Sequence, residues 1–212
     1  MHVFVDYDGT LTDDDTLDVL TRHLAGEEAW NALAIDERLE RGEISLRDAL
    51  QQQLSLVILP IEHADALLQT LVVFDPSFAG FVKECRERGV GITILSSGVK
   101  ELILLTFARN GVYDVPVIAS TVEDRPEGWI LHFHDEVPNG TDKAGIVSEA
   151  RKAGAYTIFI GDGHSDFDAA LAADRRFAKK GRALESFLRK SDVEFSTFSS
   201  FSEIQAALFP DS

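Results

Sequence analysis

The chain has 212 residues, and its 36 acidic and 20 basic side chains give a formal net charge of −16. This balance argues against nucleic acid or an anionic membrane surface as a partner, so a site for an anionic substrate must supply its own positive charge. The length suits one α/β domain with a small insert, and no apolar run reaches the roughly 20 residues of a membrane span. Because Cys85 is the only cysteine, no internal disulfide can form, and we expect a cytoplasmic protein.

The first element is a short buried strand, Val3-Phe4-Val5, which ends at two acids separated by one residue, Asp6 and Asp8. Acids at the carboxyl end of such a strand lie where open α/β sheets place their ligands. An aspartate carboxylate can attack phosphorus and form an aspartyl-phosphate, and a second acid can protonate the leaving oxygen. We therefore interpret Asp6 as a nucleophile and Asp8 as a general acid and base. The alternative is a strand that ends in an acidic surface turn.

Residues 13 to 74 show helical periodicity without any strand pattern. Four amphipathic helices are predicted: one after residues 13–16, one over 27–41, one after Ser45, and one that begins at Pro60. Short links between them indicate a compact four-helix bundle whose leucines form an ordinary core rather than a cofactor pocket. We place this bundle at residues 15–74 and the α/β core at residues 1–14 and 75–212.

The next elements form a strand-to-helix junction. A helix over 77–88 precedes a buried strand at 91–95, which leads through Ser96, Ser97 and Gly98 into a helix over 100–110. Backbone N–H groups at a helix N-terminus attract anions, so these three residues are candidate phosphate ligands. A serine that only caps the helix is the alternative.

A strand at 115–119 and a small hairpin within 121–140 follow. His132 and His134 share one face of the hairpin and would suit a metal ion, but no third ligand lies nearby, so we expect a solvated polar face. Lys143 lies in the first turn of the next helix, where its charge opposes the helix dipole, which indicates another purpose.

A buried strand at 156–160 leads into Gly161-Asp162-Gly163-His164-Ser165-Asp166, which brings two more carboxylates toward the first pair. Helices at 168–173, 183–189 and 201–209 alternate with short strands at 176–178 and 194–197. This alternation of strands and helices predicts an α/β fold with a parallel sheet.

Four of these stretches resemble the motifs of the haloacid dehalogenase-like phosphohydrolases, in family order. Asp6-Tyr7-Asp8-Gly9-Thr10 resembles motif I (DxDGT), Ser96 motif II, Lys143 motif III, and residues 161–166 motif IV (GDGxxD). The resemblance implies a Rossmann-like parallel sheet flanked by helices, with the bundle inserted after strand 1 as a helical cap. Phosphoserine phosphatase-like and MtnX-type members carry such a cap.

The same resemblance implies the site. Lys143 and Ser96 would contact the transferring phosphoryl group, with Ser97 and Gly98 beside them. Several converging acids imply a cation, because two carboxylates about 4 Å apart repel by about 4 kcal/mol at an effective dielectric near 20. Oxygen ligands suit Mg²⁺. The implied metal residues are Asp6, Asp8 through its backbone carbonyl, Asp162, and Asp166 as a ligand or as the partner of Lys143.

The substrate is less defined. Asp15 falls where phosphoserine phosphatases place a glutamate that contacts the substrate amino group, but Gln52 and Gln53 occupy the region of their carboxylate-binding arginine. We therefore predict a Mg²⁺-dependent phosphatase of a small phosphorylated metabolite, as a monomer or homodimer, with phosphoserine or a methionine-salvage enolase-phosphate as possible substrates. The alternatives are a phosphomutase with the same aspartyl-phosphate chemistry and a non-catalytic phosphate-binding module. A dehalogenase would lack Asp8.

Overall fold

A seven-stranded sheet forms the centre of the computed structural model, which describes residues 1–137 and 140–210. The strand order is β4-β3-β2-β1-β5-β6-β7, and every neighbouring pair is parallel except β3 and β4. The strands are β1 (His2–Val5), β2 (Gly91–Val99), β3 (Val117–Glu123), β4 (Ile130–His132), β5 (Thr157–Gly161), β6 (Arg175–Lys179) and β7 (Ser196–Phe198). The predicted α/β fold with a parallel sheet is confirmed.

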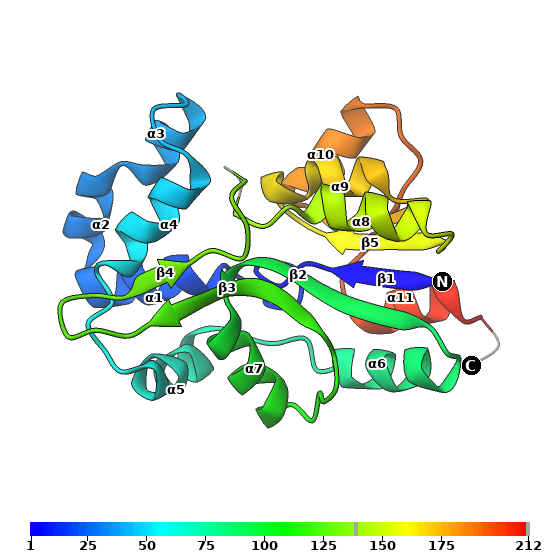
Figure 1. Cartoon of the computed structure of the whole chain (residues 1–212), viewed down its shortest axis with the longest axis horizontal. Coiled ribbons are helices and arrows are strands. Elements are labelled where there is room, and N and C mark those ends of the chain that lie inside the picture. The colour runs from blue at the N-terminus through cyan, green and yellow to red at the C-terminus, as the bar shows by residue number, and fades with distance from the viewer. Residues whose placement is uncertain (138–139, 211–212) are drawn as a thin grey trace.

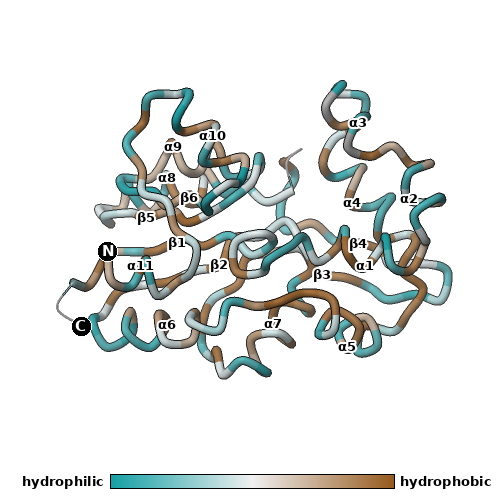
Figure 2. Tube along the Cα trace, turned by 180° about the vertical axis from the view of Figure 1, so that it is seen from behind, coloured by the Kyte–Doolittle hydropathy of each residue, from teal (hydrophilic) through white to brown (hydrophobic). Residues whose placement is uncertain are grey.

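Helices cover both faces of this sheet (Figure 1). On one face lie α8 (Lys143–Lys152), α9 (Phe167–Ala172) and α10 (Ala183–Lys190); on the other lie α6 (Phe78–Glu87), α7 (Lys100–Arg109) and α11 (Phe201–Leu208). Because successive side chains of a strand point to opposite faces, Val3 and Val5 of β1 pack with Phe78 and Phe201, whereas Phe4 packs with Phe159. Figure 2 shows the resulting apolar centre as brown trace along the strands.

Cys85 lies in α6, on the face that packs into the apolar core. Its side chain is fully buried, and burial, with a smaller contribution from the charge of Glu84, raises the pKa of its thiol to about 12. Only a thiolate reacts readily with alkylating reagents. We expect iodoacetamide at pH 8 to leave Cys85 unmodified in the native protein and to modify it in urea, as measured by mass spectrometry. Comparable modification rates in both states would contradict this placement.

The region between β1 and α6 is helical, as predicted, and contains α1 (Thr16–Ala25), α2 (Glu27–Leu33), α3 (Ile35–Glu40), α4 (Leu46–Leu54) and α5 (Ile61–Leu71). The prediction of one continuous helix over 27–41 is wrong, because Ala34 adopts a left-handed conformation (φ 47°, ψ 40°) and separates α2 from α3. Trp30 and Ile35 would lie about 140° apart around a straight helix. The break allows both to pack against Ala49 of α4, so the bundle has five helices within the described residues.

The predicted hairpin is present as the antiparallel pair β3–β4, although residues 138–139 lie outside the described part of the chain. The hairpin packs against the helical region. The side-chain amide of Gln51 in α4 donates to the carbonyl of Trp129 and accepts from the N–H of Leu131, each at 3.0 Å. The indole of Trp129 donates to the carbonyl of Leu59 at 2.8 Å. The hairpin and the helices α1, α4 and α5 therefore share one apolar cluster.

None of the helices in the described residues combines the length and apolar character that crossing a membrane requires.

Candidate active site

The carboxyl ends of three central strands bring the predicted residues together. Asp6 follows β1, Ser96 lies in β2, and Asp162 follows β5, and β1 pairs with both of the other strands. In a parallel sheet these ends meet at one edge. One cavity is lined by residues predicted from separate stretches of sequence: Asp6, Asp8, Asp15, Ser96, Ser97, Gly98, Lys143 and Asp162. Asp166 is hydrogen-bonded to the lining residue Lys143.

Lys143, at the start of α8, places a positive charge between the carboxylates of Asp6 and Asp166. Its ammonium donates to Asp6 Oδ1 at 2.6 Å, to Asp166 Oδ1 at 2.7 Å and to Ser165 Oγ at 3.2 Å. The lysine is only 3% exposed. Burial lowers its pKa, but the charges of Asp166 and Asp6 outweigh this effect, so the net pKa lies above the usual range and the side chain stays charged.

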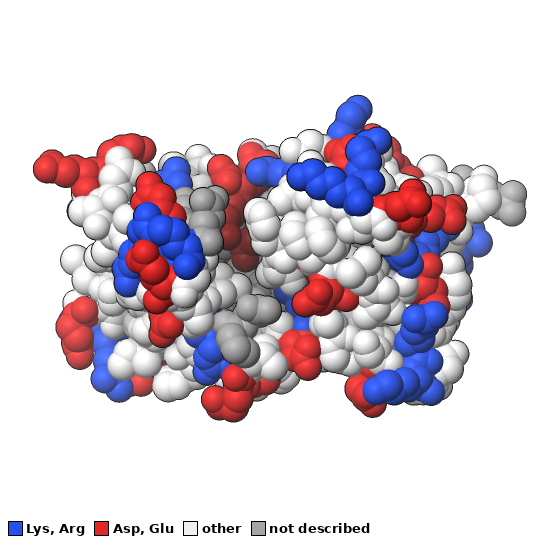
Figure 3. Space-filling model, turned by 90° about the horizontal axis from the view of Figure 1, so that it is seen from above, with Lys and Arg blue, Asp and Glu red and all other residues white. Residues whose placement is uncertain are grey.

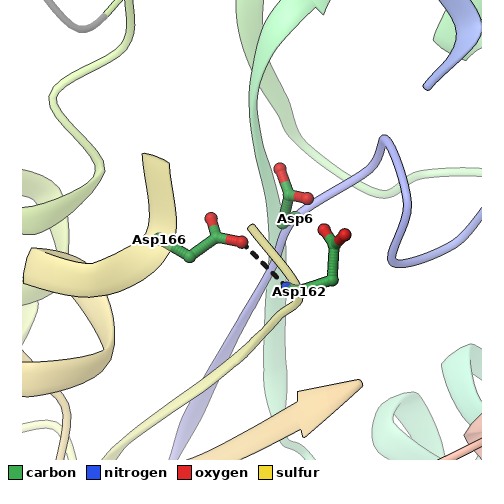
Figure 4. Close-up of side chains that lie close together, drawn as sticks. All are labelled: Asp6, Asp162 and Asp166. Carbon is green, nitrogen blue, oxygen red and sulfur yellow. Dashed lines mark hydrogen bonds between the residues drawn. The ribbon is translucent and has the colours of Figure 1, made fainter. Parts of the chain in front are cut away.

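Three carboxylates converge beside this lysine (Figure 4). One oxygen from each of Asp6, Asp162 and Asp166 lies within 4.8 Å of the others. Burial, followed by the charge of Asp166, raises the pKa of Asp6, and the same two causes raise the pKa of Asp162 to about 6. Carboxylates that resist ionisation in this way favour a cation between them, which would offset their mutual repulsion.

Within this cluster, the protein itself occupies both oxygens of Asp166. Oδ1 accepts from Lys143, and Oδ2 accepts from the backbone N–H groups of Asp162 at 2.9 Å and Gly163 at 3.0 Å. Gly161 is required here, because a Cβ at that position would lie 2.5 Å from Asp166 Oδ2. The hydrogen bonds of Asp166 therefore position Lys143 and the loop after β5.

Asp6 and Asp162 keep free coordination capacity. Asp6 Oδ2 and Asp162 Oδ1 share one protein donor, the Thr10 hydroxyl, at 3.1 and 3.0 Å. Gly9 has a left-handed backbone (φ 71°), and a Cβ there would lie 2.3 Å from Asp162 Oδ2, so only glycine allows this approach. Two carboxylates with unused lone pairs at one point are the oxygen donors that Mg²⁺ prefers, and the donor set fits that ion.

Asp8 is oriented by Thr16, the first residue of α1. Asp8 Oδ1 accepts from the Thr16 N–H at 2.9 Å and from its hydroxyl at 2.6 Å. Desolvation and the nearby charge of Asp15 raise the pKa of Asp8 to about 7, although the two hydrogen bonds from Thr16 oppose the shift. A carboxyl group with such a pKa can both give and take a proton near neutral pH.

The junction at Ser96 differs from the prediction. The strand does not end at residue 95 but continues to Val99, so Ser96, Ser97 and Gly98 lie in β2 and not at the start of α7. The Gly98 N–H is also already used, because it donates to Ser96 Oγ at 2.9 Å. Since its oxygen accepts that bond, the Ser96 hydroxyl can still donate its own hydrogen. These residues line the cavity from the end of the strand, and α7 begins directly after it at Lys100.

The cavity has a volume of about 780 Å³ and is lined by the sheet edge and by helices α1, α3 and α4. Figure 3 shows acidic side chains gathered in the hollow between the part of the molecule that carries α2–α4 and the part that carries α8–α10. Asp15 lies at its rim, where one carboxylate oxygen caps α1 by accepting from the N–H groups of Leu17 and Asp18.

The sequence analysis did not single out several residues of the site. Thr10 was visible as part of the first motif, but nothing indicated that its hydroxyl would lie between two carboxylates. Thr16 was visible only as part of a helix start, and nothing indicated its bonds to Asp8. Asp18 and Ser165 carried no local signal, because their contacts join segments that are distant in the sequence. Gln53 was noted as a departure from an arginine, and it does line the cavity.

Comparisons with known proteins identify a family and several relatives. A model of the haloacid dehalogenase-like hydrolase family matches residues 3–171. The chain is 31% identical to Pdp3-interacting factor 1 of Schizosaccharomyces pombe (98% of this chain, 94% of the relative). It is 28% identical to the polyol phosphate phosphatase PYP1 of Saccharomyces cerevisiae (97% and 91%). It is 27% identical to 2-hydroxy-3-keto-5-methylthiopentenyl-1-phosphate phosphatase of Brevibacillus brevis (95% and 92%).

Among solved structures, a phospho-aspartyl intermediate analogue of phosphoserine phosphatase superposes with a TM-score of 0.70. It covers 97% of both chains at 20% identity, so the likeness concerns the fold.

Proposed function

Because the chain belongs to the haloacid dehalogenase-like hydrolase family, as the four motifs indicated, we propose that it is a Mg²⁺-dependent phosphatase of small phosphorylated metabolites. The observation that carries the proposal is the contact of Lys143 with Asp6 and Asp166 beside Asp162, with Asp8 two residues from Asp6. This arrangement combines a nucleophile, a proton donor, a fixed positive charge and a cation site.

In the first step, one Asp6 carboxylate oxygen attacks the phosphorus of the substrate. A bond forms between this oxygen and phosphorus, the bond from phosphorus to the ester oxygen breaks, and Asp8 gives its proton to the departing alcohol. In the second step, Asp8 removes a proton from water, which attacks the phosphorus of the aspartyl-phosphate. Inorganic phosphate leaves and Asp6 is restored.

Three groups would stabilise charge on the phosphoryl oxygens. Ser96 offers its hydroxyl hydrogen, and Lys143 can exchange its longest contact, the one to Ser165 at 3.2 Å, for a phosphoryl oxygen. Asp6, Asp162 and the Asp8 carbonyl would hold Mg²⁺, which supplies further positive charge at the same place. We assign Asp166 to positioning Lys143, since both of its oxygens are already bonded.

The helical region supplies the remaining walls of the cavity. This supports the proposal that residues 15–74 form a cap over the site. The contacts of Gln51 and Leu59 with Trp129 join the hairpin to this cap. The proposed location is the cytoplasm, which the single buried cysteine supports.

Removal of divalent metal provides the direct test. We expect EDTA to abolish release of phosphate from an aryl phosphate and added Mg²⁺ to restore it. Asp162→Asn should raise the Mg²⁺ concentration for half-maximal activity by about tenfold or more, because one charged ligand is lost. Asp114→Asn, at an exposed left-handed position that asparagine also adopts, is the matched control. Full turnover in EDTA would refute the metal requirement.

The nature of the product distinguishes the two alternatives. A phosphomutase would return an isomerised phosphate ester instead of free phosphate, and a phosphate-binding module would return neither. ³¹P NMR of the reaction separates all three outcomes in one measurement.

A further inference from the structure

We propose that the side-chain pair formed by Asp18 and Gln53 selects the organic part of the substrate. On this proposal the cavity takes phosphate esters of neutral polyols and rejects esters that carry a second anionic group. The inference rests on the proposed phosphatase function and defines the substrate class of the same site.

The pair joins two helices at the wall of the cavity. Gln53 of α4 donates from Nε2 to Oδ1 of Asp18 in α1 at 2.6 Å, and both residues line the cavity. The backbone N–H of Asp18 in turn donates to Asp15 Oδ1 at 3.0 Å. Asp15, Asp18 and Gln53 therefore form a continuous polar edge on the helical side, separate from the groups that would act on phosphorus.

This edge is rich in hydrogen-bond acceptors. Contact with a carboxylate sets the orientation of the Gln53 amide, because the opposite orientation would place its oxygen against Asp18 Oδ1. One of the two Nε2 hydrogens of Gln53 is thus used, and Oε1 accepts no hydrogen bond from the residues that the structure describes. Carboxylate and amide oxygens accept hydrogen bonds, and an alcohol hydroxyl can both donate to these oxygens and accept from the remaining Nε2 hydrogen.

The charges around the cavity disfavour a second anion. The described lining residues include the carboxylates of Asp6, Asp8, Asp14, Asp15, Asp18, Asp162 and Asp168. Two lysine or arginine side chains accompany them in this part of the chain, Lys143 and Arg182, and neither comes from the helical region. Lys143 is bonded to Asp6 and Asp166, and Arg182 donates to the carbonyl of Asp13. A substrate carboxylate beside Gln53 would meet the carboxylate of Asp18, and the described lining residues of the helical region include no lysine or arginine.

The rest of the helical wall is apolar and suits a carbon skeleton. Leu17, Ile35, Leu39, Leu46 and Leu50 surround the polar edge. The volume of about 780 Å³ is within the range of small-molecule sites and exceeds what a phosphate group needs. Acceptors set in an apolar wall indicate a hydroxyl-bearing chain that lies along α1 and α4.

Two matched substrates test the proposal on the wild-type protein. Glycerol 3-phosphate and 3-phosphoglycerate differ in one group, a hydroxymethyl in the first and a carboxylate in the second. We expect kcat/KM to be about 100-fold higher for glycerol 3-phosphate, with most of the difference in KM, because the carboxylate lacks a partner. Values within threefold of each other would overturn the proposal. O-phosphoethanolamine is the third substrate, and a preference for its amine over the polyol would also overturn it.

Variants assign the selectivity to the pair. Gln53→Arg brings a bidentate partner for a carboxylate and should narrow the ratio of kcat/KM values by about tenfold or more. Asp18→Asn removes the opposing charge at nearly constant shape and should narrow the same ratio severalfold. Ser55→Arg is the control, because it adds an equal charge at the exposed end of α4, away from the cavity lining, and should leave the ratio unchanged.

Circular dichroism melting of each variant establishes that it folds. A folded Gln53→Arg protein and a folded Asp18→Asn protein that both keep the wild-type ratio would overturn the assignment to this pair. Hydrolysis of an aryl phosphate, which has no polar organic part, is measured first. Failure of the wild-type protein there would refute the phosphatase function, whereas failure only in the substrate ratio would refute the selectivity.

Discussion

Asp6→Asn should lower the rate of phosphate release by at least about 10⁴-fold. The amide that replaces the carboxylate cannot serve as an effective nucleophile. Because the catalytic residues act as a unit, loss of the nucleophile also removes most of the rate enhancement that the other residues contribute. The measurement is steady-state release of phosphate from an aryl phosphate with saturating Mg²⁺. Because asparagine has nearly the shape of aspartate and Lys143 keeps its bond to Asp166, the variant should remain folded.

The fold of this variant is checked by its thermal melting with EDTA present. Asp6 carries a raised pKa in the parent protein, so removal of its charge should cost little stability without metal. A folded Asp6→Asn protein with wild-type turnover would eliminate Asp6 as the nucleophile, and with it the two-step mechanism.

Lys143→Met should destabilise the metal-free protein by about 3–5 kcal/mol and abolish turnover. The methionine has a similar length but no charge, so the buried carboxylates of Asp6 and Asp166 lose their common cation. Breaking a buried ion pair by removal of one partner costs about this amount, because the remaining charge is left without compensation. The free energy of unfolding is measured in urea with EDTA present.

Lys179→Met is the matched control for this effect. Lys179 is about half buried, and its ammonium donates to the Thr10 carbonyl at 2.8 Å, a neutral acceptor. Loss of this bond should cost about 1–2 kcal/mol. Equal destabilisation by the two variants would contradict the assignment of a special electrostatic role to Lys143.

Local patterns were sufficient to place the candidate site on the sheet. The apolar run at Val3 predicted β1, and glycines beside acids marked the loops after β1 and β5, since close approach at Gly9 and Gly161 tolerates no Cβ. A parallel sheet brings strand ends to one edge, which placed Asp6 and Asp162 on the same edge, and the pairing of β1 with β5 in the structure then brings them together. Secondary structure was missed where tertiary packing overrode periodicity, at Ala34 and at the end of β2.

The sequence by itself thus determined the fold class and the family motifs, and it named the acids to which we assign the chemistry, because period, glycine positions and strand ends are local properties. Only the tertiary structure decided what each side chain does there. Lys143 donates to Asp6, which lies 137 residues away in the sequence. Both carboxylate oxygens of Asp166 accept hydrogen bonds from the protein. Gln53 of α4 donates to Asp18 of α1. Such contacts depend on how helices pack against the sheet and against each other, and no spacing along the chain encodes a distance between segments that far apart.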